Sequence, residues 1–385
     1  MNFNLTEDQV AFCDLARKFS EESLAPMAAE WDQTSFFPVE VIKVAAQLGF
    51  CSLYASETIG GMGLTRLDAS LVFEQLSMGC TATTAYLTIH NMVTWMIGEF
   101  ACDELKKSWG PLLACGEKLS SYCLTEPEAG SDAASLKTTA EVKGGDYVLN
   151  GSKTFISGAG STDLLLVMAR TGEGGAKGIS AFAVPADTHG ISYGRKEKKM
   201  GWNCQPTGLI SFEEVCIPAV NRLGSEGEGF RFAMKGLDGG RINIASCSVG
   251  TAQQALSTAQ RYMQVRKQFG RKLSEFQALQ FKLADMNTDL VAARQMVRMA
   301  ACRLDESHPE ATAYCAMAKR FATDVGFNVC NEALQIHGGY GYIQEYPLER
   351  YVRDTRIHQI LEGTNEVMRL IIARRLLSEH FTEIV

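Results

Sequence analysis

Apolar residues recur every three or four positions near both ends of the chain, which is the pattern of helices that bury one face. At the start, Thr6 and Gln9 form a predicted capping box, and Val10, Leu15, Phe19 and Leu24 follow it on one expected face. Near the end, the apolar positions 279, 283, 286, 290, 293, 297, 301 and 304 predict a long helix in a bundle. The same stripe would also suit a subunit interface.

The middle of the chain has a different pattern, in which short β-rich runs broken by glycine follow one another between about 123 and 228. Asn150-Gly151 lies between two such runs and predicts a hairpin turn, since both residues tolerate a positive φ. We therefore predict an α+β fold with a helical domain over residues 1–121, an antiparallel β domain over 122–228 and a helical bundle over 229–385.

Composition limits the class of protein. With 385 residues and 46% hydrophobic residues, the chain is expected to be soluble and globular. No apolar run reaches membrane-spanning length, and the start at Met1 resembles neither a signal nor a transit peptide. We therefore expect a cytoplasmic protein if Met1 is the native start, or a mitochondrial matrix protein if this is a processed form.

The net charge and the cysteine content limit which ligands and which cellular compartment are expected. The net charge of −7 argues against binding to nucleic acid. The twelve cysteines are scattered without a C-x-x-C pair, which favours a reducing compartment and argues against a metal site.

Two segments carry groups suited to a flat cofactor. In "YCLTEPEAGSDAAS" (122–135), Thr125, Ser131 and backbone N–H groups near Gly130 suit the polar edge of a planar ring, although the segment taken alone favours an ordinary polar turn with a helix cap. In "NGSKTFISGAG" (150–160), Phe155 suits one face of such a ring and Ser157 its edge. The alternative for Phe155 is a core position in a strand.

A third set suits a dinucleotide. Arg266 and Gln277 are side chains suited to pyrophosphate and adenosine groups, and Gly338-Gly339 allow backbone to approach a phosphate. The run Gly-Gly-Tyr-Gly lacks the G-x-G-x-x-G spacing, so it does not indicate a nicotinamide cofactor.

The segment "HQILEGTNEVMR" (358–369) has two interpretations. Gly363 can end one helix while Thr364 or Asn365 caps the next, with Glu366 in the first turn, which makes Glu362 part of a helix boundary. Alternatively, Glu362 is a catalytic carboxylate. The residues of this segment alone favour the boundary.

Two longer motifs decide between these interpretations. "CLTEPEAGSDAAS" and "QIHGGYGYIQEYPLERYVRD" resemble the two signatures of the acyl-CoA dehydrogenase family, and the resemblance extends from end to end. It implies a C-terminal four-helix bundle, a homotetramer, and FAD in an extended form that reaches a neighbouring subunit. The electron acceptor implied is electron-transferring flavoprotein.

The resemblance also assigns residues. For the flavin ring it implies Tyr122, Cys123, Leu124, Thr125, Gly130, Ser131, Phe155, Ile156 and Ser157, with Trp202 nearby unless it is only a partly buried indole. For the rest of FAD it implies Arg266, Phe269 and Gln277, then Gln335, Ile336, His337, Gly338 and Gly339 of a partner subunit, and Thr364, Asn365 and Glu366. For acyl-CoA or its tunnel it implies Ser131, Asp238, Gly239, Gly240, Arg241 and Arg374, although Arg241 could equally pair with a buried carboxylate.

The implied reaction removes an α-proton from an acyl-CoA with Glu362 as base, while the β-hydrogen leaves as hydride to the flavin. Some relatives place the base one residue before the arginine that matches Arg241, but Gly240 has no side chain to act. The resemblance favours isobutyryl-CoA, giving methacrylyl-CoA in valine catabolism, over butyryl-CoA or 2-methylbutyryl-CoA. Oxidases of the same fold and a DNA-binding branch with a basic C-terminal extension are the more distant alternatives.

Overall fold

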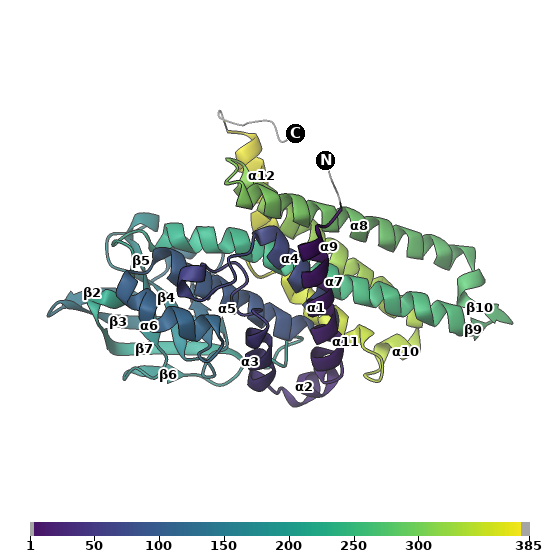
Figure 1. The fold of residues 1–385 in the computed structure, drawn as a ribbon, viewed down its shortest axis with the longest axis horizontal. Coiled ribbons are helices and arrows are strands. Elements are labelled where there is room, and N and C mark those ends of the chain that lie inside the picture. The colour runs from purple at the N-terminus through teal and green to yellow at the C-terminus, as the bar shows by residue number, and fades with distance from the viewer. Residues whose placement is uncertain (1–3, 379–385) are drawn as a thin grey trace.

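Helices occupy both ends of the chain and a mixed sheet occupies the middle in the computed structural model, which describes residues 4–378 (Figure 1). The N-terminal helices are α1 (Glu7–Phe19), α2 (Ala28–Thr34), α3 (Val39–Gln47), α4 (Arg66–Gly79), α5 (Thr81–Phe100) and α6 (Asp103–Ala114). The C-terminal helices are α7 (Gly229–Val265), α8 (Gln277–Asp305), α9 (Ala311–His337), α10 (Gly339–Tyr342), α11 (Leu348–Arg356) and α12 (Asn365–Leu376). This arrangement confirms the predicted α+β class.

The capping box predicted for α1 is present, since the Thr6 side chain accepts from the Gln9 N–H and the Gln9 side chain accepts from the Thr6 N–H. The apolar face predicted behind it is only partly right. Phe19 is buried, but Val10 and Leu15 are 45% and 41% exposed. Ala16 and Phe19, three residues apart, are the buried residues of α1, and Val10 and Leu15 are not part of this buried face.

The main sheet has the strand order β6-β7-β3-β2-β4-β5-β8, with β1 added beside β4. Its strands are β1 (Ser120–Cys123), β2 (Thr139–Lys143), β3 (Asp146–Ser157), β4 (Leu164–Arg170), β5 (Ile179–Pro185), β6 (Ile191–Tyr193), β7 (Thr207–Ile217) and β8 (Arg222–Leu223). Most pairs are antiparallel as predicted, but β4 has two parallel neighbours: β1, from Ser120↔Leu164 to Cys123↔Val167, and β2, at Thr139↔Arg170. The all-antiparallel prediction is wrong at this point because β1 enters the sheet directly from the helical domain rather than through a hairpin.

The hairpin predicted at Asn150-Gly151 is also wrong. The strand β3 runs through both residues, and Gly151 (φ 144°) lies at a bulge in its pairing with β7. The hairpin lies instead at Gly144-Gly145, where φ values of 65° and 97° join β2 to β3. A side chain at position 151 would collide with Thr138, so close approach of β2 explains this glycine.

The strand β4 is buried on both faces and separates two cores. Leu164, Leu166 and Met168 pack with α5 and with the start of α7, whereas Leu165 and Val167 pack with β3, β5 and β7 on the other side. This alternation follows from the period of two along a strand. It also places α5 and α7 over the same face of the sheet.

The helices α7, α8 and α9 share a core that Leu348 and Tyr351 of α11 complete. The stripe predicted on α8 lies in this core at Met286, Leu290 and Val297, which confirms the bundle role. The suggestion that the stripe forms a subunit interface is wrong, because α7 and α9 of the same chain cover it. No helix within the described residues is both long and apolar enough to cross a membrane.

Candidate active site

A cavity of about 690 Å³ lies where α5, the sheet, α7 and the segment before α12 meet. Its volume is within the range of ligand pockets. Ten of the sequence-predicted residues line it, namely Tyr122, Leu124, Thr125, Gly130, Ser131, Phe155, Ile156, Ser157, Arg241 and Glu362. We call it the main cavity.

Glu362 lies in the turn between the short 3₁₀ helix Ile357–Gln359 and α12. Thr364 caps α12 by accepting from the Val367 N–H at 3.2 Å, so the predicted helix boundary exists. The same turn also places Glu362 against the main cavity. Its Oε2 atom is buried and has no hydrogen-bond partner among the described residues. The predicted helix boundary is therefore confirmed, and the catalytic role of Glu362 stays a prediction that its position at the cavity allows.

The environment of the Glu362 carboxylate changes its acidity. Burial raises the pKa of Glu362 to about 7, although the positive charges of Arg241 and Lys319 act in the lowering direction. A carboxylate with a pKa near neutrality is a better proton acceptor than an ordinary glutamate, and it is mostly ionised only above that pH.

The sequence offered two roles for Arg241, which were contact with acyl-CoA and pairing with a buried carboxylate. Its Nη1 is 2.6 Å from Oδ1 of Asp238, so it pairs with a largely buried carboxylate. Its Nε lies 3.4 Å from the backbone oxygen of Glu362, and the side chain lines the main cavity. Arg241 thus links α7 to the turn that carries Glu362.

The loop after β1 is held from beneath by a buried ion pair that the sequence did not suggest. Lys153 of β3 is fully buried and donates to Glu126 at 2.7 Å and to the Leu124 carbonyl at 3.1 Å. Glu126 in turn accepts from the backbone N–H groups of Lys137 and Thr138. These contacts fix the segment that contains Thr125 at the rim of the cavity.

Three of the seven non-glycine residues with a positive φ within residues 4–378 line the main cavity. Phe155, Trp202 and Glu362 have φ values of 57°, 55° and 56°, in the left-handed region that bulky residues rarely adopt. All three line the main cavity. Such strain persists only where the surroundings impose it, and it concentrates at functional sites.

The remaining predicted residues of the turn and of α7 lie beside the main cavity rather than in its wall. Asn365 is buried and Glu366 is exposed, while Arg374 is exposed near the end of α12. Gly239 faces the Arg66 guanidinium, with which an added Cβ would collide. Cys123 is buried in the core of the sheet.

A second cavity of about 450 Å³ contains another predicted group, namely Arg266, Gln335, Ile336, His337, Gly338 and Gly339. Nothing lies within 4 Å of a Cβ built at Gly338 or Gly339, so a ligand can approach the backbone there. Phe269, in the turn between β9 (Lys267–Gln268) and β10 (Arg271–Lys272), is 93% exposed, and Gln277 begins α8 close by in sequence.

The two cavities lie far apart in one chain. Arg241 and Arg266 are both on or at the end of α7, and 25 residues of helix correspond to roughly 38 Å. Figure 1 shows the main sheet at one end of the long axis and β9 and β10 at the other. One chain therefore does not bring the two sets of predicted cofactor residues together.

The main cavity suits a flat ring with a polar edge. Phe155 is 68% exposed and lines the cavity, and the buried Tyr122 Oη and Trp202 Nε1 have no hydrogen-bond partner within residues 4–378. Unpartnered buried donors of this kind are costly unless a ligand uses them. The residues present therefore fit the isoalloxazine ring of FAD.

Sequence reasoning missed several contributors. The cavity wall also includes Met234 and Leu237 of α7, and Val367 and Ile371 of α12. These residues occupy ordinary helical positions, and only the packing of the helices shows that they face a cavity. Lys319 was missed too, although a lysine within the apolar run of α9 is an unusual feature that could have signalled it.

Comparison with known proteins matches most of the chain to one family. Models described as the N-terminal, middle and C-terminal domains of acyl-CoA dehydrogenase match residues 6–117, 121–215 and 227–377. The mitochondrial isobutyryl-CoA dehydrogenase of Bos taurus is 53% identical over 98% of this chain and 91% of its own.

Two solved structures have the same fold along their whole length. The butyryl-CoA dehydrogenase of Megasphaera elsdenii has a TM-score of 0.95 and 41% identity, over 98% of this chain and 100% of its own. A chain of a structure described as the electron transferring flavoprotein of Acidaminococcus fermentans has a TM-score of 0.96 and 43% identity, with the same coverage.

Proposed function

Since the chain belongs to the acyl-CoA dehydrogenase family of FAD-dependent oxidoreductases, we propose that it oxidises isobutyryl-CoA to methacrylyl-CoA with Glu362 as the base. The observation that carries the proposal is the unpartnered carboxylate oxygen of Glu362 at the wall of a largely apolar cavity. A buried carboxylate without a partner is costly and is retained where function requires it.

Glu362 takes the α-proton of the acyl thioester. Such a proton is too weakly acidic for an ordinary glutamate, and the raised pKa of Glu362 reduces the mismatch. Water excluded by the apolar wall would otherwise compete for the proton and solvate the carboxylate.

The negative charge that develops on the thioester oxygen needs hydrogen-bond donors. The backbone N–H of Glu362 makes no hydrogen bond within the described residues, because the left-handed turn carries it out of the preceding helix. This N–H is therefore free to donate to the thioester oxygen and to stabilise the enolate.

The protein residues that would hold FAD follow from the fit described above. Thr125 and Ser157 would bond the edge of the ring, Phe155 would cover one face, and Tyr122 and Trp202 carry free polar atoms. When bound, FAD supplies the acceptor for the hydride that leaves the β-carbon. A glutamate on one side of the acyl chain and a ring on the other would orient the two C–H bonds that break.

The branched four-carbon substrate is favoured by similarity. Identity is 53% to the bovine isobutyryl-CoA enzyme but 41% to the bacterial butyryl-CoA enzyme. One methylene or branch is worth only about 1–3 kcal/mol in such pockets, so butyryl-CoA and 2-methylbutyryl-CoA remain the competing substrates. The bovine relative also supports valine catabolism and the mitochondrial-matrix alternative for this chain.

A homotetramer would explain the separation of the two cavities. In such an assembly, Arg266 and residues 335–339 of one subunit would complete the FAD site of another. Large apolar side chains are exposed around the second cavity, including Val265 (73%), Phe269 (93%) and Tyr342 (80%), as expected for a surface that a second copy covers. Electron-transferring flavoprotein is the proposed acceptor, in keeping with the similarity to the Acidaminococcus fermentans structure.

The test is an anaerobic titration of the FAD-loaded protein with isobutyryl-, 2-methylbutyryl- and butyryl-CoA, following the flavin absorbance. Isobutyryl-CoA is expected to bleach the flavin fastest, and Glu362→Gln is expected to bind the ligand without bleaching. Glu141→Gln, at an exposed carboxylate on β2, is the matched control and should behave as wild type. Bleaching by Glu362→Gln would contradict the base assignment, and no bleaching of the wild type would contradict the proposed reaction.

A further inference from the structure

The turn that carries Glu362 has a strained backbone. Glu362 and Gly363 are consecutive residues with φ values of 56° and 87°. Glycine adopts this region freely, but a glutamate is strained there because its Cβ crowds the backbone. Contacts from outside the turn must therefore hold Glu362 in place.

Lys319 of α9 makes the most direct of these contacts. Its Nζ donates to the Gly363 carbonyl at 2.8 Å and to Oδ1 of Asn365 at 2.9 Å, and the side chain is fully buried. The preceding carbonyl, that of Glu362, lies 3.4 Å from Nε of Arg241. Two cations from neighbouring helices thus hold two successive carbonyl groups of the turn.

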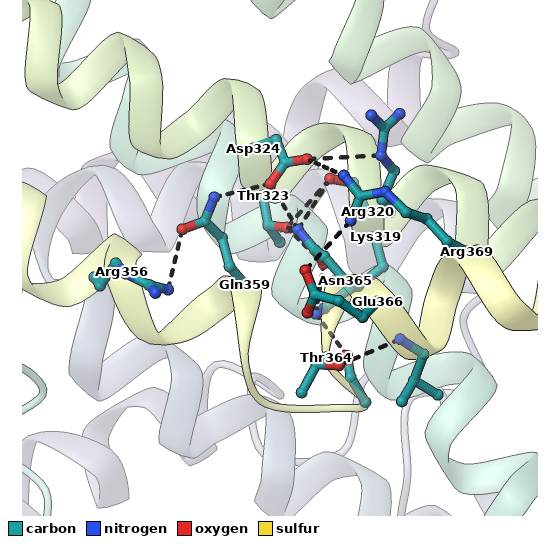
Figure 2. Close-up of polar contacts among 12 residues, drawn as sticks. Lys319, Arg320, Thr323, Asp324, Arg356, Gln359, Thr364, Asn365, Glu366 and Arg369 are labelled. Atoms are coloured by element: carbon teal, nitrogen blue, oxygen red, sulfur yellow. Dashed lines mark hydrogen bonds and ion pairs between the residues drawn. The ribbon is translucent and has the colours of Figure 1, made fainter. Parts of the chain in front are cut away.

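Asn365 ties the same turn to α9 at further points. Its Nδ2 donates to Oδ1 of Asp324 at 2.7 Å and to the Thr323 hydroxyl at 3.0 Å. Asp324 also accepts from Gln359, which precedes the turn, at 2.8 Å. Figure 2 shows these side chains converging between α9 and the start of α12, with Lys319 among them. The turn is therefore anchored to α9 on both sides of Glu362.

The charge of Lys319 has no close counter-ion. No ion pair joins it to a carboxylate within residues 4–378, and its hydrogen-bond acceptors are a carbonyl and an amide oxygen. Burial lowers the pKa of Lys319 to about 8, and the Glu362 carboxylate is the largest influence that raises it. By reciprocity, Lys319 acts to lower the pKa of Glu362.

We propose that Lys319 is a positioning residue for Glu362, which holds the strained turn through the Gly363 carbonyl and favours the ionised carboxylate through its buried charge. The inference rests on the proposed role of Glu362 as the base. It assigns two separable effects to one side chain, because the hydrogen bonds set the place of the carboxylate and the charge sets its proton affinity. A lysine that merely filled space in the bundle would produce neither effect.

The experiment compares Lys319→Met, which removes charge and hydrogen bonds, with Lys319→Gln, which removes the charge but keeps an N–H donor. Cys330→Ala, a fully buried truncation elsewhere on α9, is the control for lost stability alone. FAD content and melting temperature are measured first. The rate of flavin reduction by isobutyryl-CoA is then followed against pH under anaerobic conditions.

Both Lys319 variants should move the acid limb of the pH profile upward by about one unit, because a nearby positive charge has been lost. Lys319→Met should also lower the maximal rate by about 100-fold, since the carboxylate is displaced, and Lys319→Gln should lower it less. Cys330→Ala should keep the wild-type profile. A wild-type acid limb in both Lys319 variants would overturn the proposal, as would rate losses no larger than those of Cys330→Ala.

An infrared difference measurement separates this proposal from the proposed function. The protonated carboxyl band of Glu362, identified by its absence in Glu362→Gln, is titrated in each variant without substrate. A midpoint raised by about one unit in Lys319→Met or Lys319→Gln supports the role of Lys319 even if no acyl-CoA reduces the wild-type flavin. An unchanged midpoint in both overturns it.

Discussion

A Cβ atom built at Gly240 would lie 2.5 Å from Oε2 of Glu362, so the backbone of α7 and the carboxylate are in direct contact. Position 240 is also the place from which some relatives are expected to supply the base. Positions 240 and 362, which are 122 residues apart in sequence, thus lie next to each other in the fold. The glycine leaves room for the carboxylate that the other segment supplies.

Gly240→Ala should lower activity with little loss of stability. The added methyl group would meet the far end of a flexible side chain, which can move away, whereas no backbone atom is among its nearest contacts. We expect the reduction rate to fall by about 10- to 100-fold, because the carboxylate leaves its working position. Stopped-flow reduction and urea unfolding check this, and a rate equal to that of wild type would show that the contact is unimportant.

The pKa of Glu362 predicts how stability depends on pH. This pKa is raised from 4.5 to about 7, so between these values the folded protein retains a proton that the unfolded chain has released. The free energy of unfolding therefore falls as pH rises through this window. Glu362→Gln lacks this loss and should gain up to about 3 kcal/mol relative to wild type between pH 4.5 and pH 8. Urea unfolding of both holoproteins at several pH values measures the difference, and a constant difference would contradict the raised pKa.

Arg241→Gln should destabilise the protein by about 3 kcal/mol, because it leaves the Asp238 carboxylate buried without its cation. Arg241 and Asp238 are only 6% and 14% exposed, so water cannot fully replace the lost contact. The double variant Asp238→Asn with Arg241→Gln should recover much of this loss. Urea unfolding of the two variants is the measurement, and equal losses in both would show that the ion pair is not the cause.

Lys153→Met should weaken cofactor binding as well as the fold. It leaves Glu126 buried and removes a donor from the Leu124 carbonyl, which together fix the loop at the cavity rim. We expect a loss of about 3 kcal/mol in stability and a lower affinity for FAD. Unfolding and FAD titration of the apoprotein measure these, with Glu126→Gln plus Lys153→Met as the compensating pair. A wild-type FAD affinity in Lys153→Met would show that this ion pair does not contribute to FAD binding.

Phe269→Asp should break the proposed assembly. Its side chain is almost fully exposed in the single chain, and a charge there would be unfavourable if a second subunit covers it. We expect a smaller particle by light scattering and a reduced FAD content. Val142→Asp, at an apolar side chain on β2 that is 62% exposed, is the matched control and should keep the assembly. An unchanged particle size for Phe269→Asp would show that Phe269 does not lie in the interface.

Local patterns along the sequence determined much of the fold. The capping box at Thr6, the stripe on α8 and the cap at Thr364 depend on residues within a few positions of one another, and the structure contains all three. The order helix–sheet–helix followed from the same short-range periodicities. The family resemblance named ten of the residues that line the main cavity, Glu362 among them.

Only the tertiary structure decided the features that depend on distant segments. The turn expected at Asn150-Gly151 became a bulge because β3 continues through it and pairs with β7 from Tyr147 to Ser157. The parallel pair β1–β4 has no local signal in the sequence. Gly240 contacts Glu362, which is 122 positions away in sequence. Lys319 donates a hydrogen bond to the carbonyl of Gly363, which is 44 positions away. The raised pKa of Glu362 has the same origin, because burial and the charges of Arg241 and Lys319 exist only after α7, α9 and the turn have packed together.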